Sequence, residues 1–160
     1  MKPKIILILL ILIAAAKPGS ASVVISTGSY EVAANSTQTV AISVTNDVAF
    51  SAFQFDLVIP DHFTLVDGSV QLAGRENGHD FSYELIESNV LRCIAYSTSE
   101  TSFTGNSGAI VELQLNSGTK PGTYALEIQN ALVASGGVDV LSSVSNGSII
   151  LRAQIGRAHV

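Results

Sequence analysis

Residues 52–59 alternate between large apolar and smaller or polar side chains, and this segment constrains the fold more than any other. The odd-numbered positions from Phe53 to Ile59 are apolar, and the even-numbered ones are Ala, Gln, Asp and Val. A period of two is typical of a β-strand with one face on a core and the other free for solvent or a partner. Pro60 follows, and because proline cannot donate to a strand ladder, we expect it to end the strand.

Similar short segments recur along the chain between turn signals, and they are rich in Val, Thr and Ser. We expect strands at 23–26, 39–45, 52–59, 65–72, 81–86, 90–96, 110–115, 124–128, 131–134 and 148–151. Gly68 would mark a bulge or a bend in its segment. No segment beyond the N-terminal apolar run has helical periodicity. Eight to ten strands at this spacing predict an all-β fold, a sandwich of two packed antiparallel sheets.

Both ends of the chain differ in composition from the middle. Residues 1–21 combine lysines near the start, an apolar run over 5–16, and small residues at Gly19 and Ala21, the pattern of a secretory signal peptide. The run is shorter than the about 20 residues that span a bilayer, so we expect no membrane insertion after signal cleavage and a secreted or cell-surface location. The last six residues are what a common sequencing-library adapter encodes in this frame. We therefore expect 153–160 to be a non-native or truncated tail.

The remaining span is acidic and nearly free of cysteine. Between Ser22 and Gln154 there are four basic and thirteen acidic residues, a net charge of −9. This balance disfavours nucleic acid and anionic lipid as partners, because both need basic patches. Cys93 is the single cysteine and cannot form an internal disulfide. We expect one β-sandwich domain over 22–152, long enough to bury a core without cross-links.

No motif points to catalysis or to a cofactor. The serines lack the G-x-S-x-G spacing of a nucleophile elbow. We expect residues 75–80 to form an exposed polar loop, and His62 and His79 to be solvated loop residues. Cys93 falls within a predicted strand, where a small side chain packs. The acidic residues lack the D-x-D-x-D-G spacing of a calcium loop, although loop 76–80 leaves a structural calcium open. Paired carboxylates also leave glycoside hydrolysis open as a remote alternative.

Sugar binding is the main alternative function. Carbohydrate modules stack sugar rings on exposed aromatic side chains. The chain has no Trp, and we expect Tyr83, Tyr96 and Tyr124 to point inward, which leaves Tyr30 as the candidate. Polar loops can also bind a polysaccharide through hydrogen bonds, so a carbohydrate-binding module stays open. A spacer without a ligand of its own, in a larger surface protein, is a further alternative.

Three stretches resemble a known family when they are taken in order. They are AFQFDLVIP at 52–60, CIAYSTSETSFTGNSGAI at 93–110 and KPGTYALEIQNALV at 120–133. Over most of 22–151 the chain resembles a cohesin-type domain, and closer still the cohesin-like modules of large secreted proteins in Bacteroidota. The resemblance implies a jelly-roll sandwich of about nine strands, related to cellulose-binding modules. It also implies a non-catalytic module that docks a dockerin, a small calcium-loaded protein, in complexes that degrade polysaccharides.

The resemblance implies a partner-binding face on one sheet. The matching outward positions are Ala52, Gln54, Asp56, Ser82, Glu84, Ile86, Cys93, Ala95 and Ser97. An interface of this kind needs an apolar centre and a polar rim. We expect Ala52, Ile86, Cys93 and Ala95 to form the centre. Gln54, Asp56 and Glu84 would form the rim. Dockerin-binding cohesins often carry Asn and Asp where this chain has Ala52 and Gln54.

Overall fold

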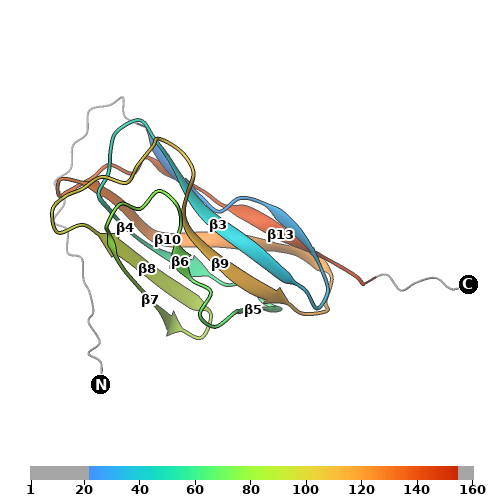
Figure 1. The fold of residues 1–160 in the computed structure, drawn as a ribbon. Helices are drawn as coiled ribbons and strands as arrows, with labels where there is room; N and C mark the ends of the chain where they lie inside the picture. The colour runs from blue at the N-terminus through green and yellow to red at the C-terminus, as the bar shows by residue number, and fades with distance from the viewer. Residues whose placement is uncertain (1–21, 155–160) are drawn as a thin grey trace, which may run out of the picture.

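The computed structural model describes residues 22–154, which form two β-sheets packed face to face (Figure 1). This confirms the predicted all-β sandwich, but each sheet contains one parallel pair of strands, so the sheets are mixed rather than antiparallel. Within the described residues, no helix is long and apolar enough to cross a membrane. The predicted signal peptide over 1–21, and positions 155–160 of the predicted tail, lie outside the described residues.

The first sheet has six strands. In spatial order they are β12 (Ser143–Ser145), β1 (Val23–Ser26), β3 (Thr37–Asn46), β9 (Ala109–Ser117) and β5 (Phe63–Leu65), with β6 (Gln71–Leu72) also paired to β9. The β1–β12 pair is parallel and the other pairs are antiparallel. Strand β9 therefore pairs with β3 on one side and with the two short strands β5 and β6 on the other.

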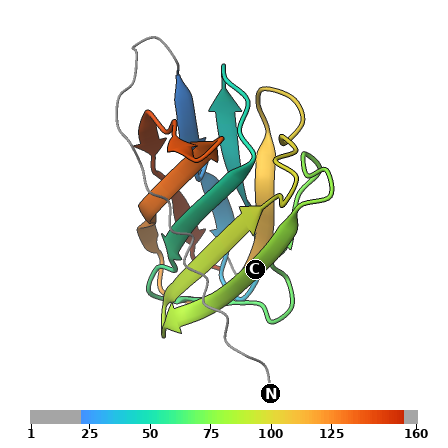
Figure 2. The same ribbon diagram turned by 90° about the vertical axis from the view of Figure 1, so that its left-hand side faces the viewer.

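The second sheet has seven strands. In spatial order they are β2 (Tyr30–Ala33), β13 (Gly147–Arg152), β10 (Gly122–Ser135), β4 (Ala52–Val58), β8 (Val90–Tyr96) and β7 (Asp80–Glu87), with β11 (Val138–Asp139) paired to the end of β10. Strands β10, β4, β8 and β7 can be followed side by side in Figure 2. Strand β7 lies at the edge of this sheet.

The core lies between the two sheets, and the alternation in residues 52–59 builds much of it. Phe53, Phe55 and Leu57 are fully buried, and burying such a side chain stabilises the fold by roughly 1.5–3 kcal/mol. Phe53 also lies 5.4 Å, centroid to centroid, from Phe103. Phe103 stacks on Phe50 at 4.9 Å, so the 97–107 loop is fixed to the core by an aromatic ring.

The strands differ from the predicted ones in several places. The structure has thirteen strands rather than about nine. The predicted strands at 124–128 and 131–134 are one continuous strand, β10. A bulge between Gln129 and Leu132 shifts the register, and β10 pairs with β4 on both sides of it. The predicted strand at 65–72 is two short strands separated by a turn at Gly68, whose φ is +77°. Strands β2, β11 and β12 were not predicted. Strand β2 pairs in parallel with β13.

Arg75 closes one end of the sandwich, although the sequence predicts it in an exposed loop. It is only 7% exposed, because its guanidinium donates to the carbonyl oxygens of Val44, Thr104 and Gly105 and to Oδ1 of Asn46. It also lies over the Phe50 ring, 5.3 Å from the centroid. Burial lowers the pKa of Arg75 from its usual value. The expectation of an exposed Arg75 is therefore wrong, since its hydrogen bonds compensate for burial of the charge.

Candidate functional site

The outer face of the seven-stranded sheet is built by the even-numbered residues of β4 and β8 and their neighbours. Its cross-strand rows follow from the register. In one row Gln54 lies between Leu132 of β10 and Ile94 of β8, and Ser82 of β7 follows Ile94. In the next row Asp56 lies between Gln129 and Arg92, and Glu84 follows Arg92. The odd-numbered residues of β4 point into the core, so these side chains point away from it.

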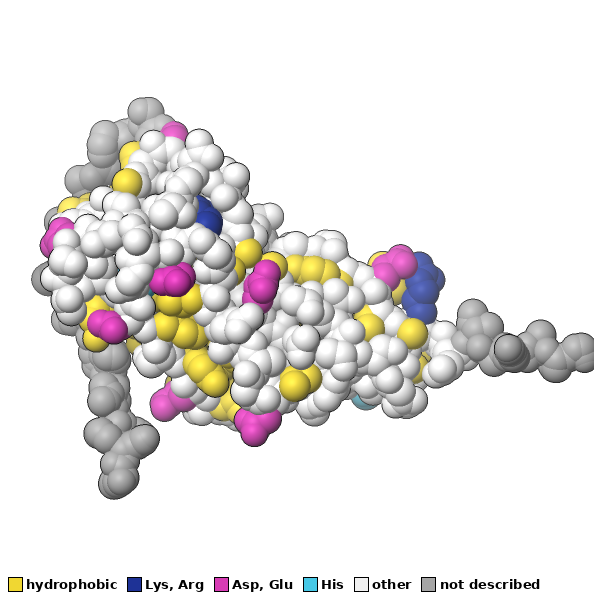
Figure 3. Space-filling view, in the orientation of Figure 1, with side chains coloured by type: hydrophobic (Ala, Val, Ile, Leu, Met, Phe, Trp, Pro, Cys, Tyr) yellow, Lys and Arg dark blue, Asp and Glu magenta, His cyan; other side chains and the backbone are white. Residues whose placement is uncertain are grey.

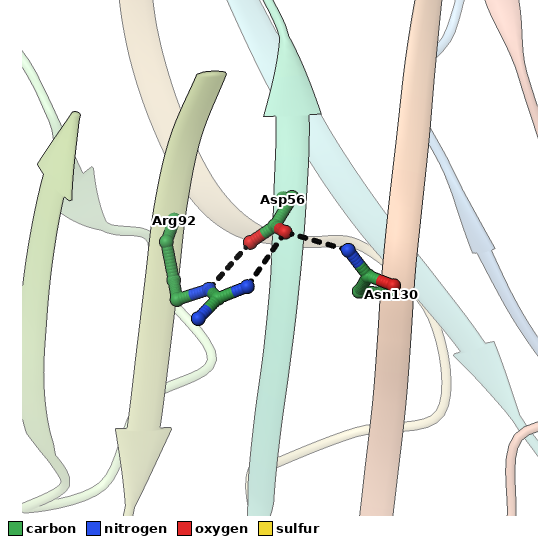
Figure 4. A network of polar contacts seen from close by, with 3 residues as sticks. All are labelled: Asp56, Arg92 and Asn130. Atoms are coloured by element: carbon green, nitrogen blue, oxygen red, sulfur yellow. Dashed lines mark hydrogen bonds and ion pairs between the residues drawn. The ribbon is translucent and has the colours of Figure 1, made fainter. Parts of the chain in front are cut away.

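A polar network of three residues lies at the centre of this face (Figure 4). Arg92 donates from Nε to Oδ1 of Asp56 at 2.7 Å and from Nη2 to Oδ2 at 2.8 Å. Asn130 donates to the same Oδ2 from Nδ2 at 2.9 Å. Asp56 is only 1% exposed although it belongs to an outer face. Planar, two-point pairing of this kind fixes side-chain geometry as well as charge.

Backbone conformation positions Asn130, and charge distinguishes Arg92. Asn130 lies in the β10 bulge with a φ of +52°, which asparagine tolerates better than most residues. Arg92 is the only basic residue in β4, β7, β8 or β10. The hydrogen bond to Asp56 raises the pKa of Arg92, and the nearby charge of Glu84 adds to the effect. The network therefore presents a fixed guanidinium on an otherwise acidic face.

Apolar side chains lie beside the network. Leu132 is half-buried, Ile94 is 5% exposed and Tyr96 is 37% exposed. Ala52 is half-buried as well. The outer face thus combines a small apolar area with amides, carboxylates and one guanidinium, which is the composition of a polar protein interface.

Cys93 and Ala95 are not on the outer face, and the expectation that placed them there is wrong. Both are fully buried, because they pair with Phe55 and Phe53 and share the inner side of the sheet with them. The outward positions of β8 are Arg92, Ile94 and Tyr96. The charge of Arg92 is the sequence signal that shows which side chains of β8 point outward. An arginine in the middle of a strand belongs on the exposed side, so the even-numbered residues of β8 share that side. Burial also raises the pKa of the Cys93 thiol, which disfavours its thiolate.

The structure brings Ala52, Gln54, Asp56, Ser82 and Glu84 onto one face, as the register above shows. Ile86 is 37% exposed and lies at a register shift of β7, between Leu85 and Glu87.

Ser97 lies just beyond the end of β8. Its Oγ accepts hydrogen bonds from the backbone N–H groups of Ser99 and Thr101. Ser97 therefore shapes the loop that follows and is not part of the face.

Of the three tyrosines predicted to point inward, Tyr83 and Tyr124 do so and Tyr96 does not. Tyr96 points outward and is 37% exposed, whereas Tyr83 is on the inner side of edge strand β7 and is 42% exposed. Tyr124 is half-buried, with its ring against Phe63. Tyr30 is also half-buried, and its hydroxyl donates to the carbonyl of Thr27 and accepts from the N–H of Ala41. Tyr30 is therefore not an exposed platform for a sugar ring.

His79 packs rather than being solvated, against the prediction. Its ring stacks on Phe103 with centroids 3.6 Å apart. Nδ1 accepts from the N–H of Asn77, and Nε2 lies 2.9 Å from the carbonyl of Thr101. These two bonds suit the neutral ring with its proton on Nε2. Burial lowers the pKa of His79, and the charges of Glu76 and Asp80 partly oppose this. Within residues 22–154, no group of three or more His, Cys, Asp or Glu side chains could hold a metal ion.

Comparison with known proteins shows the fold. No protein-family model matches the chain, and no curated protein sequence matches it. Among solved structures, a non-cellulosomal cohesin from Archaeoglobus fulgidus is similar, with 19% identity and a TM-score of 0.71 over 83% of this chain and 93% of that one. The seventh ScaB type I cohesin from Pseudobacteroides cellulosolvens matches with 18% identity and a TM-score of 0.72, over 87% of this chain and 97% of that one.

A third similar structure contains a partner. It is the sixth cohesin of scaffoldin B from Acetivibrio cellulolyticus in complex with a dockerin mutant. The identity is 15% and the TM-score 0.72, over 82% of this chain and 99% of that one. Residues 22–154 thus have the cohesin fold, which confirms the fold that the sequence resemblance implied.

Proposed function

We propose that this chain is a non-catalytic docking module that binds a protein partner through the outer face of its seven-stranded sheet. The observation that carries the proposal is the shared fold with cohesins, one of which was solved in complex with a dockerin. The partner we propose is a small dockerin-type module. The resemblance to modules of secreted proteins and the signal-like residues 1–21 support an extracellular setting, in the assembly of polysaccharide-degrading complexes.

The chemistry of the outer face supports a protein partner. Gln54, Leu132 and Tyr96 offer amide, aliphatic and aromatic contacts close together. The network of Asp56, Arg92 and Asn130 holds the guanidinium in place before binding, so little side-chain entropy is lost when a partner arrives. Glu84 lies next to Arg92 in the same row. A partner that accepts hydrogen bonds at the centre and carries basic groups at the rim would match this pattern.

The test compares one substitution on the two outer faces. Gln54→Arg places a long charged side chain at the centre of the proposed face. Gln114→Arg makes the same change at an exposed position of β9 on the opposite sheet. Both variants and the unmodified chain would be screened against an array of calcium-loaded dockerins. We expect Gln54→Arg to weaken any binding at least about ten-fold, since it desolvates a charge at the interface centre.

The Gln114→Arg variant serves as the matched control and should bind like the unmodified chain. Thermal unfolding of both variants checks that the fold is retained. Equal loss of binding in the two variants would contradict the choice of face. Absence of binding to every dockerin on the array would contradict the dockerin-type partner.

A further inference from the structure

At one edge of the seven-stranded sheet lies a second surface, which is apolar and, among the described residues, unpaired. It is the free edge of β7, the eight-residue strand Asp80–Glu87. Among residues 22–154, β7 pairs with β8 alone. The other edge of the strand therefore leaves backbone N–H and C=O groups available to another strand.

The side chains on the inner side of β7 are exposed although they are large and apolar. Tyr83 is 42% and Leu85 49% exposed. Their partners in the register are Cys93 and Leu91, which are fully buried. The core thus covers β8 but does not extend over Tyr83 and Leu85 of β7. Phe81, at the other end of the strand, is half-buried and packs against the core.

The space-filling view shows where this surface lies. Apolar side chains gather in a stripe along the side opening of the sandwich, between β6 and β7, and carboxylates lie beside the stripe (Figure 3). The stripe belongs to the side of the molecule, whereas the outer face of the seven-stranded sheet is the broad surface beyond β4 and β8.

The charge on β7 indicates what would pair with it. Asp80 and Glu84 point to the outer side, and Glu87 lies at the end of the strand. Strand β7 carries no basic residue. Two copies of β7 side by side would bring these carboxylates together, which is destabilising. An added strand with Lys or Arg at its outward positions would instead form cross-strand ion pairs with them.

We propose that the free edge of β7 binds an extended peptide of another protein by strand addition. The peptide alternates apolar residues, which cover Tyr83 and Leu85, with basic residues, which face Asp80 and Glu84. In this mode main-chain hydrogen bonds supply affinity and alternate side chains supply specificity. Covering Tyr83 and Leu85 removes apolar surface from water, which favours binding. The proposal does not rest on the docking function, since it uses the edge of the sheet, although Glu84 borders both surfaces.

The experiment measures binding of a capped eight-residue peptide of alternating Lys and Val by fluorescence anisotropy. A peptide of the same composition, with four Lys followed by four Val, controls for charge alone. We expect the alternating peptide to bind at least about ten-fold more tightly than the block peptide, because only the alternating one places all its apolar side chains on one side. Replacing Lys by Glu in the alternating peptide should abolish binding.

The variant Tyr83→Thr, Leu85→Thr removes the apolar side chains while keeping residues that favour strands. It should lose at least about ten-fold in affinity for the alternating peptide, since two apolar contacts are lost. The control is Val144→Thr, an exposed apolar residue of β12 in the other sheet, which should bind normally. Gln54→Arg, three strands from the added peptide, should also bind normally, and this separates the edge from the docking face.

Four results would overturn the proposal. The first is equal affinity for the alternating and block peptides. The second is unchanged affinity in the Tyr83→Thr, Leu85→Thr variant with its thermal unfolding intact. The third is no binding up to about 1 mM alternating peptide. Sedimentation showing dimers of the chain that the same double variant abolishes would also overturn it, since a second copy would then be the occupant.

Discussion

Two arginine–carboxylate pairs on the seven-stranded sheet have similar geometry and very different surroundings. Arg92 and Asp56 pair at 2.7 Å with side chains 35% and 2% exposed. Arg152 and Glu31 pair at the same distance with side chains 60% and 56% exposed. The central pair is joined by Asn130, and the pair at the β2–β13 end is surrounded by solvent. The two pairs therefore differ in interaction energy although their distances are equal, because solvent screens the second pair more than the first.

The difference is also one of function. The central pair fixes a guanidinium in the middle of the proposed docking face, and its loss would leave a buried carboxylate. The exposed pair, Arg152 and Glu31, joins strands β13 and β2, which backbone hydrogen bonds already hold together. We therefore expect substitutions in the two pairs to differ in effect, and the following predictions test that difference in order of size.

The largest effect is expected for Arg92→Ala. It leaves the Asp56 carboxylate buried with only Asn130 as a hydrogen-bonding partner in the network. We expect a loss of about 3 kcal/mol in the free energy of unfolding, the low end for breaking a buried pair, because the Arg92 side chain is itself 35% exposed. Urea unfolding at pH 7 measures it. The double variant Arg92→Ala, Asp56→Ala should recover part of the loss, and a larger loss in the double variant would contradict the stated cause.

A smaller effect is expected at Asn130. Asn130→Gly removes the hydrogen bond to Asp56 while keeping a residue that adopts the positive φ of the bulge. We expect it to cost about 1.5 kcal/mol, as for a hydrogen bond to a charged group. Asn130→Ala should cost about 1 kcal/mol more, because alanine is strained in the left-handed region. Equal costs for the two substitutions would show that backbone conformation at the bulge is unimportant.

His79 is intermediate in exposure between the buried Arg92–Asp56 pair and the exposed Arg152–Glu31 pair, since its ring is packed but near the surface. Burial lowers its pKa, so the unfolded chain binds a proton more readily than the folded one. Stability is therefore complete above the ordinary histidine pKa of about 6.5 and declines as the pH falls below it, until the folded ring is protonated as well. Urea unfolding of the unmodified chain between pH 7.5 and 5.5 measures the decline. His79→Phe, which retains a ring over Phe103, should flatten it, and an identical slope in this variant would assign the decline to other groups.

The smallest effect is expected for the exposed pair. Glu31→Gln and Arg152→Gln should leave the unfolding temperature unchanged within error, because both groups are open to solvent and salt. The hydrogen bond from Arg152 lowers the pKa of Glu31. Any contribution of the pair is therefore present at neutral pH and lost as the pH falls through the folded pKa of Glu31. A clear destabilisation at 0.15 M salt would make the comparison between the two pairs invalid.

Much of the fold follows from the alternation in the sequence. The inward set on β4 was predicted because Phe53, Phe55 and Leu57 alternate without interruption. The prediction of which side chains point outward was wrong on β8, where it chose Cys93 and Ala95. Every residue from Val90 to Tyr96 except Arg92 is apolar enough for a core, so alternation gave no guide. A strand that is apolar on both sides carries little information on its orientation, and Arg92 alone distinguishes the two sides.

Other features depend on contacts between distant residues. The bulge at Asn130 brings its amide to Asp56, 74 positions away in the sequence. Arg75 reaches Val44 and Thr104, 31 and 29 positions away. These pairings are set by how the sheets pack, and no local pattern marks them. The exposure of Tyr83 and Leu85 also depends on where the core ends, which alternation along β7 does not show.

The central claim is that the outer face of the seven-stranded sheet docks the partner. Amide chemical shifts of the chain, recorded before and after addition of a dockerin that binds it, test this most directly. We predict that the shifts that change cluster on β4, β8 and β10, around Gln54, Arg92 and Leu132, and that β3 and β9 are unaffected. Changes concentrated around Thr39 and Gln114, on the opposite sheet, would contradict the claim.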